Sequence, residues 1–504
     1  MTETVRIERG RYHDSVTLMR ASTAARDIPG VEAVIAAMGT ELNLALLVQA
    51  GFAPPDATAD DLVVAVSADG PATAEAAVAA IERQLAERGP AAGGDRERTI
   101  PAPRTVESAA ARAPHAGVVL VSVPGPHAYV EALAALRAGR HVMVFSDGVE
   151  VAAEVALKRE ATALGRLVMG PDCGTAVLEG VGLGFANVVV PGPVALVAAS
   201  GTGAQQLCCL LDGAGIGVRH VIGVGGRDLS SDVGGASTLA ALAALDDDPA
   251  VAVIGVVSKP PDPHVAEAVT AAAARCRTPV VLALVGHGGP TLTDAAAEIA
   301  AALGSPFAEP QWWWAPGGPA SARPGPVLGL FSGGTNAAEA LVVLEDRLGP
   351  VRSNVHPDRS RRIGPFDPAG GAHVLLDLGD DELTAGRPHP MIDPAVVADR
   401  VRAAADADGG AGVVLLDVVL GHGAHPDPAS VLAPALSAAR AAGATTVAVL
   451  IGTAGDPQGL DRQARALADA GAIVHRSNAR GAEQAAALLT GTGPETVGAR
   501  SSRS

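Results

Sequence analysis

Two stretches of this sequence follow the same plan and decide the fold. The first is PGPVALVAASGTGAQQL (191–207), and the second is PGPVLGLFSGGTNAAEAL (324–341). In each, an apolar run that is typical of a buried strand ends in small Gly, Ser and Thr residues and continues as a helical pattern. The offset is 133 residues, which places Gly201 on Gly334. We therefore expect two related domains, each with a helix that starts directly after a central strand.

Such a turn is suited to binding an anion. The first backbone N–H groups of a helix have no partner within the helix, and the helix dipole adds positive charge at the same end. Two such turns predict a site in which an anionic group is held between two helix ends. The residues that we expect to bind the anion are Ser200, Gly201, Thr202, Gly203, Gly333, Gly334, Thr335 and Asn336.

The composition restricts the class of protein. Apolar residues make up 48% of the 504 residues and aromatic residues only 2%, so the cores are built from Ala, Val and Leu, as in parallel sheets between helices. A net charge of −17 argues against nucleic-acid or anionic-membrane partners. No apolar run approaches the ~20 residues that span a bilayer. The four cysteines form no disulfide framework and no paired metal-binding motif. These features predict a cytoplasmic protein with no metal site.

Alternating strand and helix patterns predict four domains of a multidomain α/β fold. Residues 1–95 form a small amino-terminal α/β domain, and a Pro- and Gly-rich linker joins it to residues 105–190. The third domain (191–304) and the fourth (325–490) each contain four long apolar runs, which indicate parallel buried strands. We expect both to be flavodoxin-like, with functional groups at the carboxyl ends of their strands.

Three further groups lie in loops that follow strands of the third domain. Arg227 lies in GGRD, Lys259 in SKPP and His287 in GHGG. Because the carboxyl ends of parallel strands meet at one edge of a sheet, we expect these side chains to converge on the first turn. The guanidinium could clamp a carboxylate or phosphate, and the ammonium would add a point charge. We therefore predict that Lys259, Arg227 and His287 are catalytic.

Lysine is scarce in this chain. Of 37 basic residues, only Lys158 and Lys259 are lysine. A lysine at a position in a chain with so many arginines indicates that a compact ammonium group is needed there instead of a planar guanidinium group. Chance survival is the alternative explanation at each position.

Longer motifs resemble the succinyl-CoA synthetase superfamily, the NDP-forming acyl-CoA synthetases. The 105–190 domain is similar to the Rossmann-like CoA-binding domain of that family through VSVPGP (121–126) and GPDC (170–173). The third domain is similar to its first ligase-CoA domain, and the fourth to the carboxyl-terminal domain of its β chain. The resemblance implies CoA as a cofactor. It also implies three residues of the CoA-binding-type domain, Pro124, Asp172 and Cys173.

More narrowly, the whole chain resembles the FdrA proteins. The motifs that carry this likeness include DSVTLMR (14–20), GGRDLS (225–230) and GRPHPMIDP (386–394). By resemblance, FdrA-type proteins are linked to the multi-subunit oxamate carbamoyltransferase of allantoin catabolism, a part of purine degradation. The resemblance therefore implies partner subunits in a hetero-oligomer.

Departures from the superfamily shape the expected function. The family phosphorylates a histidine in a Gly-His-Ala-Gly motif that this sequence lacks, and Lys259 stands where the family has a glutamate that orients this histidine. The ATP-grasp portion of the family's β chain is also absent. We therefore expect an acyl-CoA synthetase-like protein that binds CoA and an acyl phosphate, with the nucleotide chemistry supplied by another chain. One alternative is a subunit of oxamate carbamoyltransferase, with carbamoyl phosphate as the substrate. The other is a non-catalytic regulatory or scaffold subunit that binds an anionic metabolite.

Overall fold

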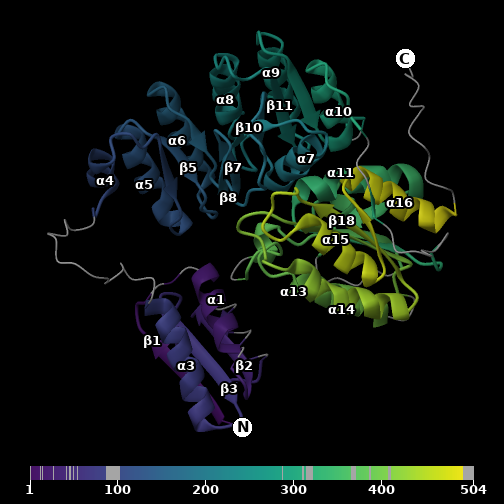
Figure 1. The fold of residues 1–504 in the computed structure, drawn as a ribbon. Helices are drawn as coiled ribbons and strands as arrows, with labels where there is room; N and C mark the ends of the chain where they lie inside the picture. The colour runs from purple at the N-terminus through teal and green to yellow at the C-terminus, as the bar shows by residue number, and fades with distance from the viewer. Residues whose placement is uncertain are drawn as a thin grey trace. The chain divides into compact units, whose positions relative to one another are not determined.

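The structure is a computed structural model (Figure 1). It describes residues 2–86 except 12, 14, 27, 41–42, 45–46, 49 and 54; residues 103–308 except 287; residues 312–313; residues 322–406 except 365–370 and 385–386; and residues 410–491. The chain divides into two compact units, and each is described by itself. The smaller unit comprises residues 1–102 with 382–388, and the larger one residues 103–381 with 389–504.

The smaller unit is an antiparallel sheet with helices on one face. Its elements are β1 (Thr2–Glu8), α1 (Ser15–Arg26), β2 (Val31–Met38), β3 (Leu62–Ala68) and α3 (Pro71–Ala86). Strand β3 is central and pairs antiparallel with β1 and β2. Because side chains alternate along a strand, Val64 and Val66 pack against α1 and α3, whereas Val63 and Ala65 pack on the opposite face.

The larger unit begins with a small parallel sheet of three strands. Its elements are α4 (Val106–Arg112), β4 (Val118–Val121), α5 (Gly125–Arg137), β5 (His141–Val144), α6 (Val151–Ala163) and β6 (Val168–Met169). The strand order is β4-β5-β6, which is half of a Rossmann-like sheet. Helices α5 and α6 cover one face, while Met143 and Met169 on the other face join the core of the next domain.

A six-stranded sheet follows in the order β12-β11-β9-β10-β7-β8. Its elements are β7 (Thr175–Leu178), β8 (Val181–Gly184), β9 (Val194–Ala198), α7 (Gly201–Gly213), β10 (Val218–Gly223), α8 (Ala236–Asp246), β11 (Val253–Ser258), α9 (Pro263–Ala273), β12 (Val280–Leu284) and α10 (Leu292–Ala302). Strands β10, β9, β11 and β12 are parallel and flavodoxin-like in order. The hairpin β7–β8 adds antiparallel to β10. The sheet therefore starts before the expected boundary at residue 190.

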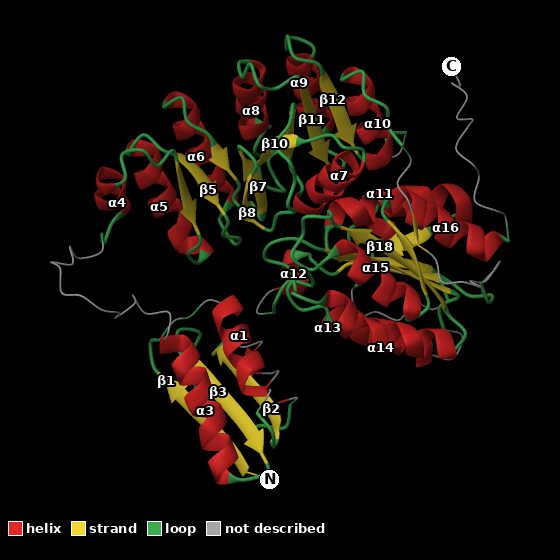
Figure 2. Cartoon of the chain, viewed as in Figure 1, coloured by secondary structure: helices red, strands yellow, loops and turns green. Residues whose placement is uncertain are grey.

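The last sheet has seven strands in the order β13-β19-β18-β17-β14-β16-β15. Its elements are β13 (Trp312–Trp313), β14 (Val327–Phe331), α11 (Gly334–Leu348), β15 (Val351–Ser353), the 3-10 helix η1 (Arg359–Arg361), β16 (His373–Asp377), α12 (Asp381–Thr384), α13 (Ala395–Asp406), β17 (Val413–Val419), α14 (Pro428–Ala441), β18 (Thr445–Ile451), α15 (Leu460–Asp469), β19 (Ala472–His475) and α16 (Asn478–Thr490). All strands are parallel except β13, which pairs antiparallel with β19 at the edge. Figure 2 shows helices α11 and α16 on one side of this sheet and α13 and α14 on the other.

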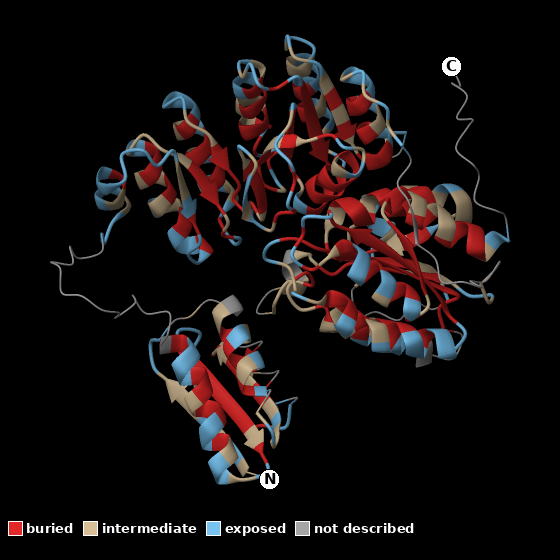
Figure 3. Ribbon diagram, viewed as in Figure 1, coloured by how far each residue is buried: buried red, intermediate tan, exposed pale blue. Residues whose placement is uncertain are grey.

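The central strands of both large sheets are buried along their whole length. Every residue of β9, β11, β17 and β18 is buried, and helices lie on both faces of the sheets (Figure 3). The cores consist mainly of Val, Leu, Ile and Ala, as the low aromatic content predicts. The α/β class with mostly parallel sheets is confirmed. Within the described residues, no helix combines the length and the apolar character needed to cross a membrane.

Candidate functional site

The starts of helices α7 and α11 meet head to head. Each helix begins directly after a central strand, β9 or β14, at the positions that the 133-residue offset relates. A Cβ atom on Gly333 would overlap Oγ1 of Thr202, and one on Gly203 would lie 2.8 Å from Cγ2 of Thr335. Each threonine therefore packs against a glycine of the other domain. The structure brings the two predicted turns together, and only glycine leaves room for this approach.

The start of α7 is accessible. Ser200 caps the helix, because its Oγ accepts a hydrogen bond of 3.0 Å from the N–H of Gly203. Gly201, the first helical residue, is exposed, and a Cβ at its position would lie 3.1 Å from Oγ1 of Thr175. A second hydroxyl thus lies beside a helix end that carries partial positive charge.

The start of α11 is different, because two carboxyl groups of the chain already face it. The N–H of Ser332 donates to Oδ1 of Asp417 at 2.8 Å, and Nδ2 of Asn336 lies 3.4 Å from its Oδ2. Oδ2 of Asp377 lies 3.0 Å from the position of a Cβ on Gly334. A helix N-terminus favours the nearest negative group. The two turns therefore differ: the protein's own acids face the start of α11, whereas the start of α7 is open.

Both carboxyl groups are buried, and their protonation is shifted accordingly. Burial raises the pKa of Asp377 to about 7, against the opposing effects of the Gly379 N–H and the charge of Lys259. Burial also raises the pKa of Asp417 to about 6, although hydrogen bonds from Ser332 and Asn336 oppose this rise. Both groups therefore change protonation close to neutral pH.

Lys259 lies at the same edge of the sheet, directly after β11. Its charge lowers the pKa of Asp377 in the neighbouring domain, so the two groups are close enough to interact electrostatically. In the described part of the chain, the ammonium has no hydrogen bond or ion pair. Lys259 lines a cavity of about 290 Å³. The other lining residues are Gly226, Leu229, Ser230, Ser231, Ser258, Pro260, Pro261 and Asp262.

Arg227 is engaged elsewhere. Its Nε donates to Glu154 at 3.1 Å and its Nη2 to the carbonyl of Val149 at 2.8 Å, so it ties the third domain to the residues around α6. Lys158 completes this link, with Nζ 2.7 Å from both Glu154 and Asp228. The buried acid Glu154 requires cations beside it. The placement of Arg227 therefore favours a structural role over the predicted anion clamp.

The remaining predicted residues are spread over two places. Pro124 precedes α5, where the carbonyl oxygens of Asp147 and Gly148 lie against Gly125. A Cβ atom at Gly125 would overlap these carbonyl oxygens, so only glycine fits at the first position of α5.

The other two residues of the CoA-binding-type domain follow β6. Asp172 has a positive φ of 57°. Cys173 is buried beside the carbonyl of Thr175, and burial raises the pKa of its thiol to about 12. The Cys173 side chain is therefore a neutral thiol in the core. His287 lies outside the described residues.

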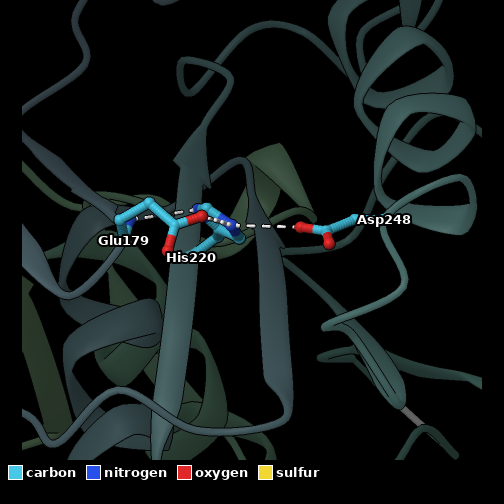
Figure 4. A group of neighbouring side chains, drawn as sticks. All are labelled: Glu179, His220 and Asp248. Carbon is cyan, nitrogen blue, oxygen red and sulfur yellow. Dashed lines mark hydrogen bonds and ion pairs between the residues drawn. The ribbon is translucent and has the colours of Figure 1, made fainter.

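One group of three described side chains has the spacing of a metal site: Glu179, His220 and Asp248 (Figure 4). Nε2 of His220 lies 3.4 Å from a carboxylate oxygen of each acid. The backbone N–H of Glu179, however, donates to Nδ1 of the same ring at 3.3 Å. The proton of the neutral ring then belongs on Nε2, the atom that a metal would need unprotonated. These residues fit an imidazole N–H shared between two carboxylates and do not fit a metal ion.

Buried polar contacts hold the two large domains in this arrangement. The carboxyl of Glu339 on α11 accepts from the N–H of Leu292 on α10 and from Nδ2 of Asn478, the latter at 2.7 Å. Nδ2 of Asn187 donates to Asp456 across the same interface at 2.7 Å. Sequence reasoning missed these residues, because nothing local distinguishes them from ordinary polar positions.

Comparison with known proteins places the chain in a family. The chain is 36% identical to the uncharacterized protein YahF of Escherichia coli, over 95% of this chain and 97% of YahF. The chain belongs to the YahF family. Two family descriptions also match parts of this YahF-family chain: "AllF, heavy metal-associated domain" over residues 1–101 and "CoA-ligase" over residues 330–488. Residues 1–101 contain no cysteine and a single histidine, His13, so they do not fit a thiolate-bound heavy metal.

More distant likeness extends to acyl-CoA chemistry. Subunit alpha 1 of the ADP-forming succinate–CoA ligase of Archaeoglobus fulgidus is 32% identical to this chain over 141 residues. The matched region is 27% of this chain and about half (48%) of that subunit. Among solved structures, a dinucleotide-forming acetyl-coenzyme A synthetase of Ca. Korarchaeum cryptofilum, in complex with phosphate and ADP, is similar to this chain with a TM-score of 0.31 and 16% sequence identity. The match covers 79% of this chain and 87% of the synthetase chain. For an ATP citrate lyase of Methanothrix soehngenii, the match covers 36% of this chain and 31% of the lyase chain, with 19% sequence identity and a TM-score of 0.31. Scores this low do not bear on function.

Proposed function

We propose that this chain is a succinyl-CoA synthetase-like FdrA protein that binds an acyl phosphate at the start of α7 and transfers its acyl group to a nucleophile. The observation that carries the proposal is the interlocked pair of helix starts, Thr202 against Gly333 and Thr335 against Gly203. The CoA-ligase match over residues 330–488 supports the same class.

The chemistry follows from the charges at the site. The exposed start of α7 offers the N–H groups of Gly201 and Thr202 to a phosphate. The ammonium of Lys259, which has no partner among the described residues, adds a positive charge at the same edge of the sheet. Both stabilise the negative charge that develops on a phosphate as it leaves an acyl group. If CoA is bound, its thiol is the nucleophile that would receive the acyl group.

Carbamoyl transfer is the second candidate, with oxamate as the acceptor and carbamoyl phosphate as the donor. One observation favours it: the amino-terminal match over residues 1–101 is to the AllF heavy metal-associated domain. In this role we expect the chain to work with other protein subunits in a hetero-oligomer.

The two candidates differ in the donor and the acceptor that they use. The full-length protein, with any subunits that copurify, is incubated with carbamoyl phosphate and oxamate or with acetyl phosphate and CoA, and phosphate release and product are measured. Acceptor-dependent phosphate release in the first mixture supports carbamoyl transfer, and thioester formation in the second supports the acyl-CoA activity. Binding of the phosphates without any transfer would contradict both and leave a regulatory subunit.

A further inference from the structure

Asp377 combines a fixed carboxyl group with an oxygen that has no hydrogen-bond partner among the described residues, and it lies beside the start of α11. We infer that Asp377 is the residue that takes up the proton of the attacking nucleophile in the acyl transfer proposed above, on which this inference rests. Nothing in the repeated turns predicts this role, because Asp377 is the last residue of a different strand, β16.

The position of the carboxyl group is fixed from both sides. The main chain of Asp377 forms two hydrogen bonds of 2.9 Å with the side chain of Asn354. The N–H of Asp377 donates to Oδ1 of Asn354, and the carbonyl of Asp377 accepts from Nδ2 of Asn354. The Oδ1 atom of Asp377 accepts from the N–H of Gly379 at 3.0 Å. A group that is held in this way needs little reorganisation to react.

The second oxygen points to the helix starts. Oδ2 of Asp377 has no hydrogen bond with any residue that the structure describes, and it lies 3.0 Å from a Cβ position on Gly334. Gly333, the preceding residue, contacts Thr202 of α7. This oxygen therefore lies beside the residue that follows Gly333, the point at which α11 contacts α7.

The neighbouring acid shows why Asp377 is the candidate. Both oxygens of Asp417 are engaged, by the N–H of Ser332 and by Nδ2 of Asn336. Asp417 thus supports the turn before α11, whereas Asp377 keeps one oxygen for a ligand.

The charges around Asp377 suit proton exchange at neutral pH. Burial and the acids Asp380 and Asp417 raise its pKa, and the Gly379 N–H and Lys259 lower it, with a result of about 7. The ring of His389 also lies close, beside Gly379, and burial lowers the pKa of this histidine to about 4, so it adds no charge. A carboxyl with a pKa near the working pH can both accept and release a proton.

The step balances without another reactant. The nucleophile X–H, a thiol or an amine, attacks the acyl carbon, and the new C–X bond forms while the proton moves from X to Oδ2 of Asp377. The bond between the acyl carbon and the phosphate oxygen breaks, and phosphate leaves with the electron pair at the start of α7 and near Lys259. Asp377 then releases the proton to water.

Sulfate tests the contact between Asp377 and the bound anion, because it mimics phosphate but does not titrate between pH 5.5 and 8.5. Calorimetry of sulfate binding to the full chain, in buffers of different ionisation enthalpy, measures the protons taken up. A nearby anion raises the pKa of a carboxyl, so we expect proton uptake by the native protein. We expect Asp377→Asn to bind sulfate without this uptake, and Asp248→Asn, altered in the partly buried cluster with Glu179 and His220, to behave as the native protein does.

The outcomes separate the two proposals. Absence of sulfate binding to the native protein would overturn the proposed function and this inference with it. Binding with the same proton uptake in Asp377→Asn would overturn only the role of Asp377. With whichever acyl phosphate turns over, Asp377→Asn should lower kcat by about 10²–10⁴-fold and remove the low-pH limb of the rate profile, the usual loss for a general base. A decrease of less than about tenfold would refute the catalytic role.

Discussion

The two lysines of this chain have opposite environments. Nζ of Lys158 is buried and meets three acceptors: Glu154, Asp228 and the carbonyl of Val224, at 2.7, 2.7 and 3.0 Å. The three N–H donors of the ammonium thus each have one acceptor. A planar guanidinium group could not direct its donors to these three positions from a single nitrogen atom. The ammonium of Lys259 is unpaired within the described ranges and lines a cavity.

Replacement of each lysine by methionine should therefore affect different properties. Lys158→Met leaves Glu154 and Asp228 buried without their cation, and we expect a loss of about 3–5 kcal/mol in the free energy of unfolding, measured with urea. Lys259→Met should change stability by less than about 0.5 kcal/mol. It should weaken sulfate binding by about tenfold or more, equal to about 1.4 kcal/mol, and reduce its salt dependence.

A matched control is Arg277→Met, which removes an exposed cation of the same domain. It should change neither property by a measurable amount. Equal effects of the two lysine replacements on sulfate affinity would contradict this division of roles.

At this scale the sequence reveals which residues are unusual but not what they contact. Glu154 precedes Lys158 by four residues, so a helical pairing was predictable from the sequence. Asp228 and Arg227 reach the same network from another domain, and this depends on how the domains dock. Asp417 carries a readable signal, a lone acid within the apolar strand β17. Its hydrogen bond to Ser332 depends on the pairing of β14 with β17, which no local pattern encodes.

At the scale of elements, the interlocked starts of α7 and α11 depend on glycine. Gly333→Ala would place a methyl group on the side chain of Thr202, in contact with buried neighbours that have little room to move. We expect a loss of about 1–3 kcal/mol, the usual range for overpacking, together with weaker sulfate binding. Thermal unfolding and calorimetry measure the two effects.

Gly117→Ala is the control for this substitution. Gly117 is exposed, and a Cβ on it would meet no atom within 4 Å. Removal of the Thr202 methyl group in Gly333→Ala/Thr202→Ser should recover part of the loss. If Gly333→Ala is as stable as Gly117→Ala, the two helix starts are not in the close contact described.

The helix starts were predictable because the sequence repeats them, with the same small residues after an apolar run. Strands β9, β11, β14 and β17 were predictable for a similar reason, since long apolar runs have few alternatives to a buried parallel strand. The hairpin β7–β8 joins the sheet of the following domain through β10. That pairing is non-local, and the expected boundary at residue 190 therefore fell after the hairpin.

At the scale of the whole molecule, Glu339 links stability to pH. Burial raises its pKa to about 7 from an ordinary value of 4.5, against hydrogen bonds from Leu292 and Asn478. Because the pKa of Glu339 is higher in the folded state, the folded protein favours the protonated carboxyl. The resulting contribution to the free energy of unfolding is fully present below about pH 4.5 and is lost as the pH rises through about 7. The contribution is on the order of 3 kcal/mol, because each pKa unit is worth about 1.4 kcal/mol.

Glu339→Gln should make the free energy of unfolding less dependent on pH over this range. Urea unfolding between pH 4.5 and 8.5 measures the effect, and we expect the variant to lose less stability than the native protein over that interval. Glu298→Gln changes an exposed glutamate on the adjacent helix α10 and should leave the slope as it is. A native slope in Glu339→Gln would show that other groups govern the pH dependence.

The starts of α7 and α11 belong to one polypeptide, and this has a consequence for how the site assembles. Because both halves are covalently joined, each meets the other at an effective concentration set by the chain and not by the amount of protein in solution. Dilution to nanomolar levels should therefore leave the affinity of each molecule for its anion unchanged, even where it separates the protein from other subunits.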